Sequence, residues 1–278
     1  LALVVAAASA GPGEEGAAGV SATRGTTIRL AYVEWSTEIA STNLVRAVLQ
    51  EKAGFRCEIV PMGAEAMWAA VASGEVDAMV SAWLPSTHEH YWERYRDRVV
   101  DLGPNLEGTR IGLVVPDVNV GRQTDPSGTR NAPYIRVTSI DELPRFAERF
   151  GLAIVGIDPG AGVMHRTREA MEVYDLGVRY QLVEGDERSM LEELTEAIQG
   201  QRWIVVTGWE PHWMFGRWEL RFLEDPEGVY GGREAIHTIV RPGLAEEAPE
   251  AFRILDRFHW STEEMDRLMA WIQREEGL

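Results

Sequence analysis

Three tryptophans stand at the ends of three short apolar segments, and their type and placement suit ligand binding better than those of any other residues in the chain. The segments end as YVEW at residues 32–35, VSAWLP at 80–85 and VTGWEP at 206–211. In open α/β sheets, ligands sit in the crevice outside the carboxyl ends of strands. Trp35, Trp83 and Trp209 could therefore form a box of indole faces. Such a box suits a cation without hydrogen-bond donors, above all a quaternary ammonium. Packing in the core or at a hinge is the alternative for each tryptophan taken alone.

A glycine-rich turn offers a second kind of binding chemistry. The sequence DPGAG at residues 158–162 follows an apolar strand pattern and precedes a helical one. Backbone N–H groups at such a helix start are free, and the positive end of the helix dipole lies behind them. The turn at Gly162 and Val163 could therefore hold a phosphate or a carboxylate. Its spacing matches neither the dinucleotide fingerprint nor the P-loop. A simple tight turn is the alternative.

Two histidines add to these candidates. His88 begins an HEH motif five residues after Trp83. It could reach into the crevice as a donor to an anion, or lie on the surface at the start of a helix. A His-x-His pair can bind zinc, but no third or fourth ligand is evident nearby, so we expect no metal. His212 follows Trp209 closely and could support the site from behind. Trp213 is ambiguous because it stands only four residues past Trp209.

The rest of the sequence argues against an enzyme. It contains no nucleophile elbow, catalytic carboxylate pair or cofactor motif, so we expect neither catalytic residues nor a cofactor. Glu34 and Glu210 flank two of the tryptophans, but strand alternation directs them away from the indole side. The formal net charge of −17 and the pI near 4.8 argue against nucleic acid or an anionic membrane as a partner.

The first 26 residues resemble a processing segment. Residues 1–10 are an apolar run that ends in Ala-Ser-Ala, like the hydrophobic core and cleavage site of a secretory signal. The run is too short to span a bilayer. Residues 11–26 have the composition of a flexible leader. A buried strand or helix at residues 1–10 is the alternative. The single cysteine, Cys57, is expected to be a small buried hydrophobe.

The remaining chain alternates between strand and helix patterns, which predicts an α/β fold with a parallel sheet. Strands are expected at residues 27–33, 57–60, 78–82, 153–157, 180–183 and 203–206. Helices are expected at residues 38–53, 64–73, 164–174 and 189–198. Residues 118–136 are polar and rich in turn residues, so we expect a surface loop there.

The two halves of this pattern resemble each other, because both contain a helix, a glycine, an apolar strand and then Trp-x-Pro. We therefore predict two lobes joined by two extended segments at residues 111–116 and 236–241. The first lobe would comprise residues 27–112 plus 236–278, and the second residues 113–235. The C-terminal residues have helical spacing and are expected to pack back on the first lobe.

Over residues 28–272, the chain resembles the substrate-binding proteins of glycine betaine/proline betaine ABC importers. The motifs that carry the resemblance are AYVEWSTEIASTN at 31–43, SAWLPSTH at 81–88, GIDPGAGVM at 156–164, TGWEPHWMF at 207–215 and EAIHTI at 234–239. The segment at residues 118–136 looks longer than is usual in that family.

The resemblance implies a two-lobed periplasmic-binding-protein fold of type II, with the ligand cleft between the lobes. It implies that Trp35, Trp83 and Trp209 enclose a trimethylammonium group. It also implies that the backbone amides of Gly162 and Val163 hold a carboxylate, with His88 able to assist.

On this basis we expect an extracytoplasmic or periplasmic solute receptor that is secreted across the inner membrane. It would be a monomer that binds glycine betaine, proline betaine or a similar ligand and delivers it to an ABC permease. A choline or other quaternary-amine binding protein is one alternative, and a sensor domain for the same ligand is another. An enzyme on the same scaffold is a third.

Overall fold

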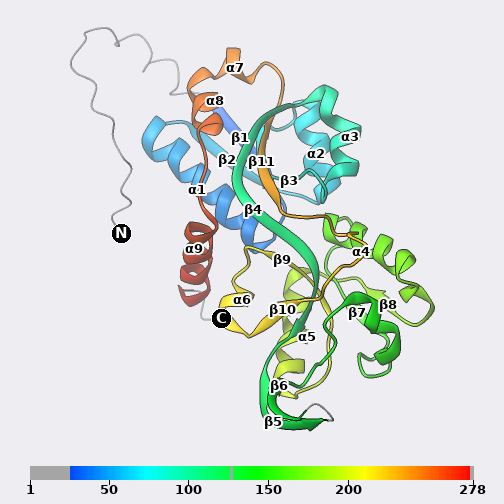
Figure 1. Cartoon of the computed structure of the whole chain (residues 1–278). Coiled ribbons are helices and arrows are strands. Elements are labelled where there is room, and N and C mark those ends of the chain that lie inside the picture. The colour runs from blue at the N-terminus through cyan, green and yellow to red at the C-terminus, as the bar shows by residue number, and fades with distance from the viewer. Residues whose placement is uncertain (1–25, 126–127, 276–278) are drawn as a thin grey trace.

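The computed structural model describes residues 26–125 and 128–275. Its centre is a curled, mixed sheet of nine strands with helices on both faces (Figure 1). Eight of the strands lie in the order β2-β1-β3-β11-β4-β9-β7-β8, and β10 pairs with β4 beside this path. The expected α/β architecture is confirmed, with antiparallel strands in the middle that the sequence patterns did not indicate.

The first half of the sheet is built from both ends of the chain. Its strands are β1 Thr27–Tyr32, β2 Arg56–Pro61, β3 Ala78–Leu84, the first part of β4 Val100–Pro116, and β11 Glu234–Val240. β1 is parallel to β2 and β3, whereas β11 runs antiparallel to β3 and β4.

The helices of this half cover its two faces. They are α1 Ser36–Ala53, α2 Ala64–Ser73, α3 Glu89–Tyr95, α7 Leu244–Glu247, α8 Pro249–Asp256 and α9 Thr262–Glu275. Gly54 and Gly74 end α1 and α2 with φ angles of 71° and 77°, a left-handed conformation that glycine adopts without steric cost. The helix ends that the sequence predicted at these glycines are confirmed.

The second half of the sheet extends from the far end of β4. Its other strands are β7 Ala153–Val155, β8 Gln181–Val183, β9 Val206–Glu210 and β10 Leu220–Phe222. Its helices are α4 Gly162–Val173, α5 Glu187–Gln199 and α6 Met214–Arg217. Short 3-10 turns occupy Arg96–Arg98, Ile140–Phe146 and Leu176–Val178.

The long strand β4 joins the two halves. It pairs with β11 along its first part and with β9 from Arg110 to Val114. The sequence indicated only residues 111–116 as extended, because residues 100–110 contain Gly103, Pro104 and Gly108, which are unusual in strands. The residue boundaries of the two lobes stay a prediction.

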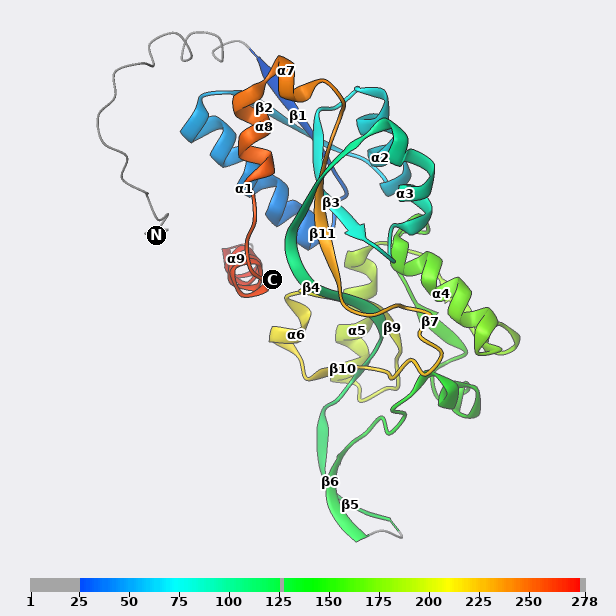
Figure 2. The ribbon, with the colours of Figure 1, turned by 45° about the horizontal axis from the view of Figure 1, so that its top comes forward.

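The prediction of a surface loop at residues 118–136 is wrong, because much of this segment forms paired strands. β5 Asn119–Asp125 and β6 Gly128–Pro133 pair as an antiparallel hairpin that projects from the second half (Figures 1 and 2). The many turn-forming residues in this segment indicated a loop, so the strand pairing could not be predicted from the sequence. The strand expected at 203–206 is also displaced, because β9 begins at Val206.

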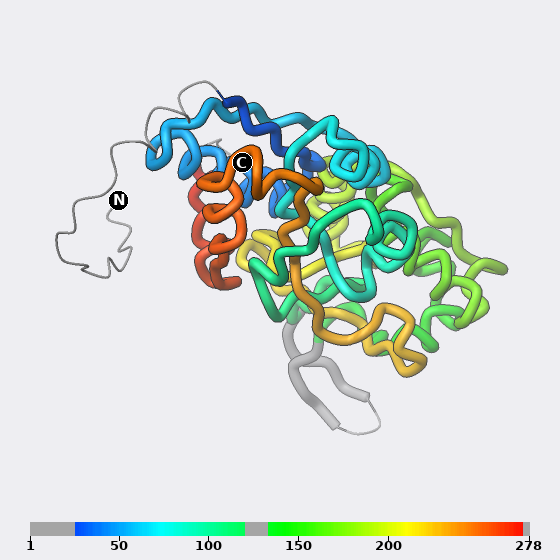
Figure 3. Tube along the Cα trace, turned by 90° about the horizontal axis from the view of Figure 1, so that it is seen from above, coloured from blue at the N-terminus to red at the C-terminus, as the bar shows by residue number. Residues whose placement is uncertain are grey.

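One cluster of buried side chains runs through both halves and includes Trp68, Met79, Leu113 and Ile154. A second cluster, which includes Leu30, lies in the first half. Cys57 is also buried, as expected. α8 and α9 contact α1, so the prediction that the C-terminal residues pack back on the first half is confirmed (Figure 3). Within the described residues, no helix combines the length and the apolar character needed to cross a membrane. The expected processing segment at residues 1–26 lies outside them, except for its last residue.

Candidate functional site

One small cavity lies between the two halves of the sheet. It is lined by Trp35, Trp83, Thr87, His88, Ile111, Ile157, Ala161, Gly162, Val163 and Trp209. All six candidate site residues from the sequence are in this set. They come from the ends of β1, β3 and β9, from the turn that precedes α3, and from the start of α4.

The three tryptophans line the cavity and are almost withdrawn from solvent. Trp35, Trp83 and Trp209 are 7%, 4% and 4% exposed. The ring centroids of Trp35 and Trp209 are 6.5 Å apart, with an interplanar angle of 52°. Tilted faces at this spacing form two walls of a box rather than a stack. The alternative that these residues only fill the core does not explain why all three border one cavity.

Two of the indoles are oriented by carboxylates. Trp35 Nε1 donates to Asp158 Oδ2 at 2.9 Å, and Trp83 Nε1 donates to Glu38 Oε1 at 2.8 Å. The first bond joins one half of the sheet to the other. The second lies within the first half, where Glu38 is fully buried. These bonds fix which ring faces are left for a ligand.

The third indole is supported through a histidine. The ring of His212 meets the ring of Trp209 edge-on, with centroids 4.7 Å apart. Its Nδ1 accepts from the N–H of Met214 at 3.1 Å, so Nε2 carries the proton and donates to Glu187 Oε1 at 3.1 Å. His212 therefore stands behind the site, as the sequence suggested.

The glycine-rich turn presents two free backbone donors. Ala161 precedes α4 in an extended conformation, and the N–H groups of Met164 and His165 bond back to its carbonyl. The N–H groups of Gly162 and Val163 have no recorded acceptor among the described residues. Both residues line the cavity, which therefore borders the positive amino end of α4.

Gly162 also permits a close approach between the two halves. A Cβ atom at this position would lie 2.4 Å from the Thr87 carbonyl oxygen. Thr87 is itself held by buried Glu234, whose carboxylate accepts from the backbone N–H groups of Ser86 and Thr87 at 3.2 and 3.0 Å. Only glycine allows the anion turn to come this near to the segment that carries His88.

His88 is buried rather than on the surface. Its Nδ1 accepts from the Trp83 N–H at 3.2 Å and from Trp68 Nε1 at 3.4 Å, which leaves the proton on Nε2. Nε2 is buried and has no hydrogen-bond partner. Burial lowers the pKa of His88 to about 3, with a smaller effect from His90, so the ring is neutral at physiological pH. It offers one unused N–H donor at the cavity wall.

Further hydrogen bonds connect the two sides around the cavity. Tyr91 Oη donates to the Gly160 carbonyl at 2.8 Å, and Arg166 donates to the Ser86 carbonyl at 2.7 Å. On another side, the Ser36 N–H donates to Glu187 Oε2 at 2.8 Å. These bonds surround the cavity, and the halves are therefore in a closed arrangement.

Sequence reasoning missed the carboxylates behind the indoles, namely Glu38, Asp158 and Glu187, and the buried Glu234. A Glu three residues after Trp35 gives no sign of pairing with Trp83, because that contact depends on the path of α1. Asp158 belongs to the DPGAG turn, but the sequence interpretation considered only the backbone N–H groups of that turn and not the Asp158 carboxylate. Trp213 borders the groove outside the cavity and donates from Nε1 to Ser36 Oγ at 3.1 Å.

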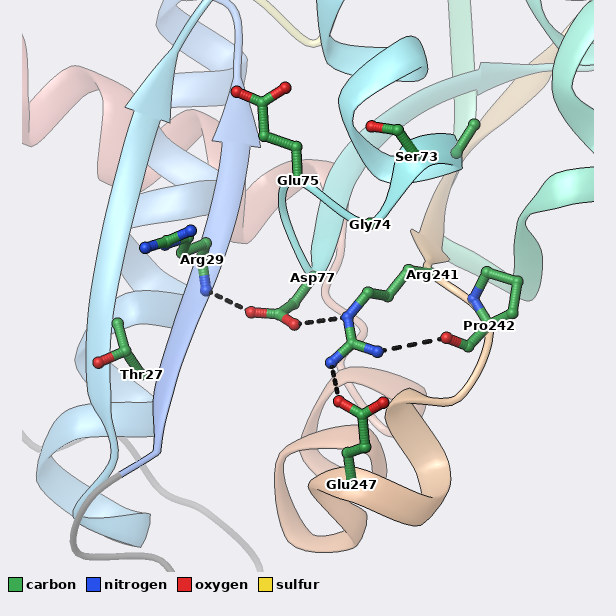
Figure 4. A pocket seen from close by; sticks show the side chains of 10 residues that line it. Thr27, Arg29, Ser73, Gly74, Glu75, Asp77, Arg241, Pro242 and Glu247 are labelled. Atoms are coloured by element: carbon green, nitrogen blue, oxygen red, sulfur yellow. Dashed lines mark hydrogen bonds and ion pairs between the residues drawn. The ribbon is translucent and has the colours of Figure 1, made fainter.

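A second hollow lies near the amino end of β1 (Figure 4). Asp77 accepts there from the Arg29 N–H and from Arg241 Nε, both at 2.8 Å, and Arg241 also donates to Glu247 at 2.6 Å. These polar groups satisfy one another. In the part of the chain that the structure describes, no three His, Cys, Asp or Glu side chains are grouped to hold a metal ion.

The fold and the cavity between its halves define a binding protein of the periplasmic type, with a ligand cleft between two lobes. Comparison with known proteins gives the family. The model described as the substrate binding domain of the ABC-type glycine betaine transport system matches residues 26–278. The chain belongs to this family, and it is a substrate-binding protein rather than an enzyme.

Two solved structures are similar over nearly the whole chain. Lactococcal OpuAC, crystallised in a closed-liganded conformation with glycine betaine, is 40% identical and superposes with a TM-score of 0.80. That match covers 89% of this chain and 90% of OpuAC. ProX from Borrelia burgdorferi, a glycine betaine/L-proline-binding protein, is 37% identical with a TM-score of 0.82. That match covers 91% of this chain and 89% of ProX.

A curated relative is similar over a shorter region. The glycine betaine/carnitine transport binding protein GbuC of Listeria monocytogenes is 44% identical over 143 residues, which are 51% of this chain. The match spans 46% of GbuC, less than half of that protein.

Proposed function

We propose that this protein captures glycine betaine or a related quaternary-ammonium osmolyte and delivers it to the permease of an ABC importer. The observation that carries the proposal is the pairing of two chemistries in one cavity. Three indoles line it together with three residues that have unpaired N–H donors, namely Gly162, Val163 and His88. A small zwitterion with a bulky cation matches both.

The indole box suits a trimethylammonium group because that group cannot donate hydrogen bonds. Its positive charge is attracted to the negative face of an aromatic ring, at about 1–2 kcal/mol for each desolvated contact. Three such contacts and the bonds to a carboxylate are compatible with micromolar binding, which corresponds to about −8 kcal/mol. Trp35, Trp83 and Trp209 supply these contacts in the proposal.

The donors suit a carboxylate because they are preorganised. The N–H groups of Gly162 and Val163 lie at the positive end of α4, and the neutral His88 ring adds a donor without adding charge. A buried donor that has no partner within the protein gains one when the ligand enters. Choline lacks a carboxylate and would leave these donors unpaired, so we place it second.

The proposal extends to the setting of the protein. A substrate-binding protein of an importer works outside the cytoplasmic membrane, so we place this one in the periplasm or another extracytoplasmic space, as a monomer. A sensor domain for the same ligand would have the same cavity but a different partner from the permease.

Isothermal titration calorimetry tests the proposed ligand. Glycine betaine, proline betaine, carnitine and choline are titrated into the protein under one set of conditions. We expect micromolar affinity for at least one betaine and a weaker affinity for choline. Absence of binding by all four compounds at millimolar concentration would reject the proposal, and choline as the tightest ligand would select the alternative.

A further inference from the structure

Glu38 is a buried carboxylate without a compensating cation. Its side chain is fully buried, and no ion pair with it is recorded within the described residues. Its Oε2 atom makes no hydrogen bond of normal geometry. An unpaired buried charge is costly, because water no longer solvates it. The Ser81 hydroxyl contributes a hydrogen bond that lowers the pKa of this carboxyl, but a neutral hydroxyl does not balance its charge.

The other carboxylate oxygen connects Glu38 to the cavity. Oε1 accepts the indole N–H of Trp83 at 2.8 Å, and Trp83 lines the cavity. Glu38 also stands in the first turn of α1, where the helix dipole favours a negative charge. Glu38 does not itself line the cavity, so Trp83 is the residue that connects its charge to a ligand there.

We propose that Glu38 is the counter-charge of the bound quaternary ammonium and sets the preference of the site for a cationic ligand over a neutral one of the same shape. This inference rests on the proposed function. Glu38 is a positioning residue that acts through Trp83. It orients the indole, and its charge makes the ring a stronger partner for a cation in a site from which water is excluded.

The ionisation of Glu38 follows from the same arrangement. Burial raises the pKa of Glu38, against the lowering effect of hydrogen bonds that include the one from Trp83. A cation across the ring favours the charged carboxylate, so ligand binding lowers this pKa. The negative charge of Glu38 is therefore best balanced when a cationic ligand occupies the cavity.

A pair of ligands that differ only in charge tests the proposal. Glycine betaine and 3,3-dimethylbutanoate have the same shape, because a neutral tert-butyl group replaces the trimethylammonium. The measured quantity is the ratio of their dissociation constants. We expect Glu38→Gln, which keeps an acceptor for Trp83 but removes the charge, to reduce the preference for betaine by roughly tenfold. Glu38→Asp should retain more of the preference than Glu38→Gln, even if both ligands bind more weakly to it.

Glu34→Gln is the matched control. Glu34 precedes Trp35 and carries the same formal charge, but it is exposed, so water and salt screen it. Its removal should leave the ratio within about twofold of the parent. An equal loss of both ligands in Glu38→Gln would show a merely structural role and overturn the inference, while betaine binding by the parent would keep the proposed function intact.

A measurement on the parent protein covers the case in which the variants do not fold. In protein carrying ¹³C-labelled glutamate, the Glu38 carboxyl should titrate at lower pH with betaine bound than with 3,3-dimethylbutanoate bound. Identical titrations would overturn the inference. If the parent binds no quaternary ammonium compound at all, the proposed function fails instead, and calorimetry distinguishes this outcome directly.

Discussion

At the scale of single residues, each cavity tryptophan depends on a carboxylate that does not itself line the cavity. Asp158 and Glu38 accept the indole N–H groups of Trp35 and Trp83, and Glu187 holds the histidine that meets Trp209 edge-on. A hydrogen bond to the edge of an indole leaves both faces free. The site therefore combines fixed ring orientation with open π faces, which is what recognition of a cation without donors requires.

Replacing Trp35, Trp83 or Trp209 with Ala should each weaken glycine betaine binding by about 1–3 kcal/mol, because one wall of the box is lost. The measurement is calorimetry, with circular dichroism to confirm folding. Trp271→Ala is the matched control, since Trp271 is 46% exposed on α9 and should leave affinity unchanged. Parent-like binding by all three cavity variants would show that the cation is held elsewhere.

His88→Ala should weaken betaine binding by about 1–2 kcal/mol and choline binding by less. Removing the Nε2 donor affects only a ligand that has a carboxylate, and a hydrogen bond to a charged group is worth about this much. The backbone N–H of Trp83 bonds to His88, so the substitution could also displace Trp83. Choline binding controls for this effect, because it should depend on Trp83 but not on the His88 donor. Equal losses for choline and betaine would remove His88 from the carboxylate site.

At the scale of secondary structure, much of the site could be predicted, because strand ends and helix starts have local sequence signals. Trp35, Trp83 and Trp209 stand at or just after the ends of β1, β3 and β9, and Gly162 begins α4 after a glycine-rich turn, as the local patterns indicated. Their role in binding stays a prediction. The pairing of β4 and β11 was not predictable, since it joins residues 100–109 to residues 234–240. Neither was the role of Glu38, because a long-range contact decides it.

Gly162→Ala should block closure around the ligand. The added Cβ would lie 2.4 Å from the Thr87 carbonyl oxygen. This clash involves a backbone atom, which cannot rotate away as a flexible side chain could. We expect at least a tenfold loss in betaine affinity and an unchanged melting temperature without ligand, because the open form separates the two segments. Gly160→Ala is the control in the same turn. Its Cβ would meet only Tyr91 Oη at 3.7 Å, so parent-like affinity is expected. Equal effects of both substitutions would contradict this account.

A histidine pair spans the two halves near the cavity. The rings of His90 on α3 and His165 on α4 stack with centroids 4.5 Å apart. Burial lowers the pKa of His90 to about 4, with further lowering by His165 and Arg166 and an opposing effect from Glu169 and Glu65. In an open form His90 would leave this stack and recover a pKa nearer its ordinary value of about 6.5.

Closure should therefore weaken in acid. A depressed pKa means that the closed form gains its full advantage above pH 6.5 and loses it as the pH falls towards 4. Betaine affinity should drop several-fold between pH 7 and pH 5. The drop should be smaller than the full difference in the pKa of His90 would produce, because His90 is partly solvated. His90→Gln should flatten the calorimetric pH profile. An unchanged profile in that variant would show that another group titrates.

At the scale of the whole molecule, the cavity contacts are divided between the two halves of the sheet. Trp35, Trp83 and His88 come from the first half, whereas Trp209 and the Gly162–Val163 turn come from the second. Hydrogen bonds from Trp35 to Asp158 and from Ser36 to Glu187 cross between them. All of these contacts exist together only when the halves are close, so a ligand that uses both sides favours the closed form.

Small-angle scattering with each ligand at saturation tests this coupling. Glycine betaine should reduce the radius of gyration and raise the melting temperature, because it binds the closed, folded form. Choline presents the same cation without the carboxylate, so it should occupy the indoles while leaving the α4 donors unpaired, and it should compact the protein less. Gly162→Ala should abolish the difference between the two ligands by preventing full closure in both cases. Identical compaction of the parent by choline and betaine would mean that the Gly162–Val163 turn does not recognise the carboxylate, and it would favour choline as the ligand.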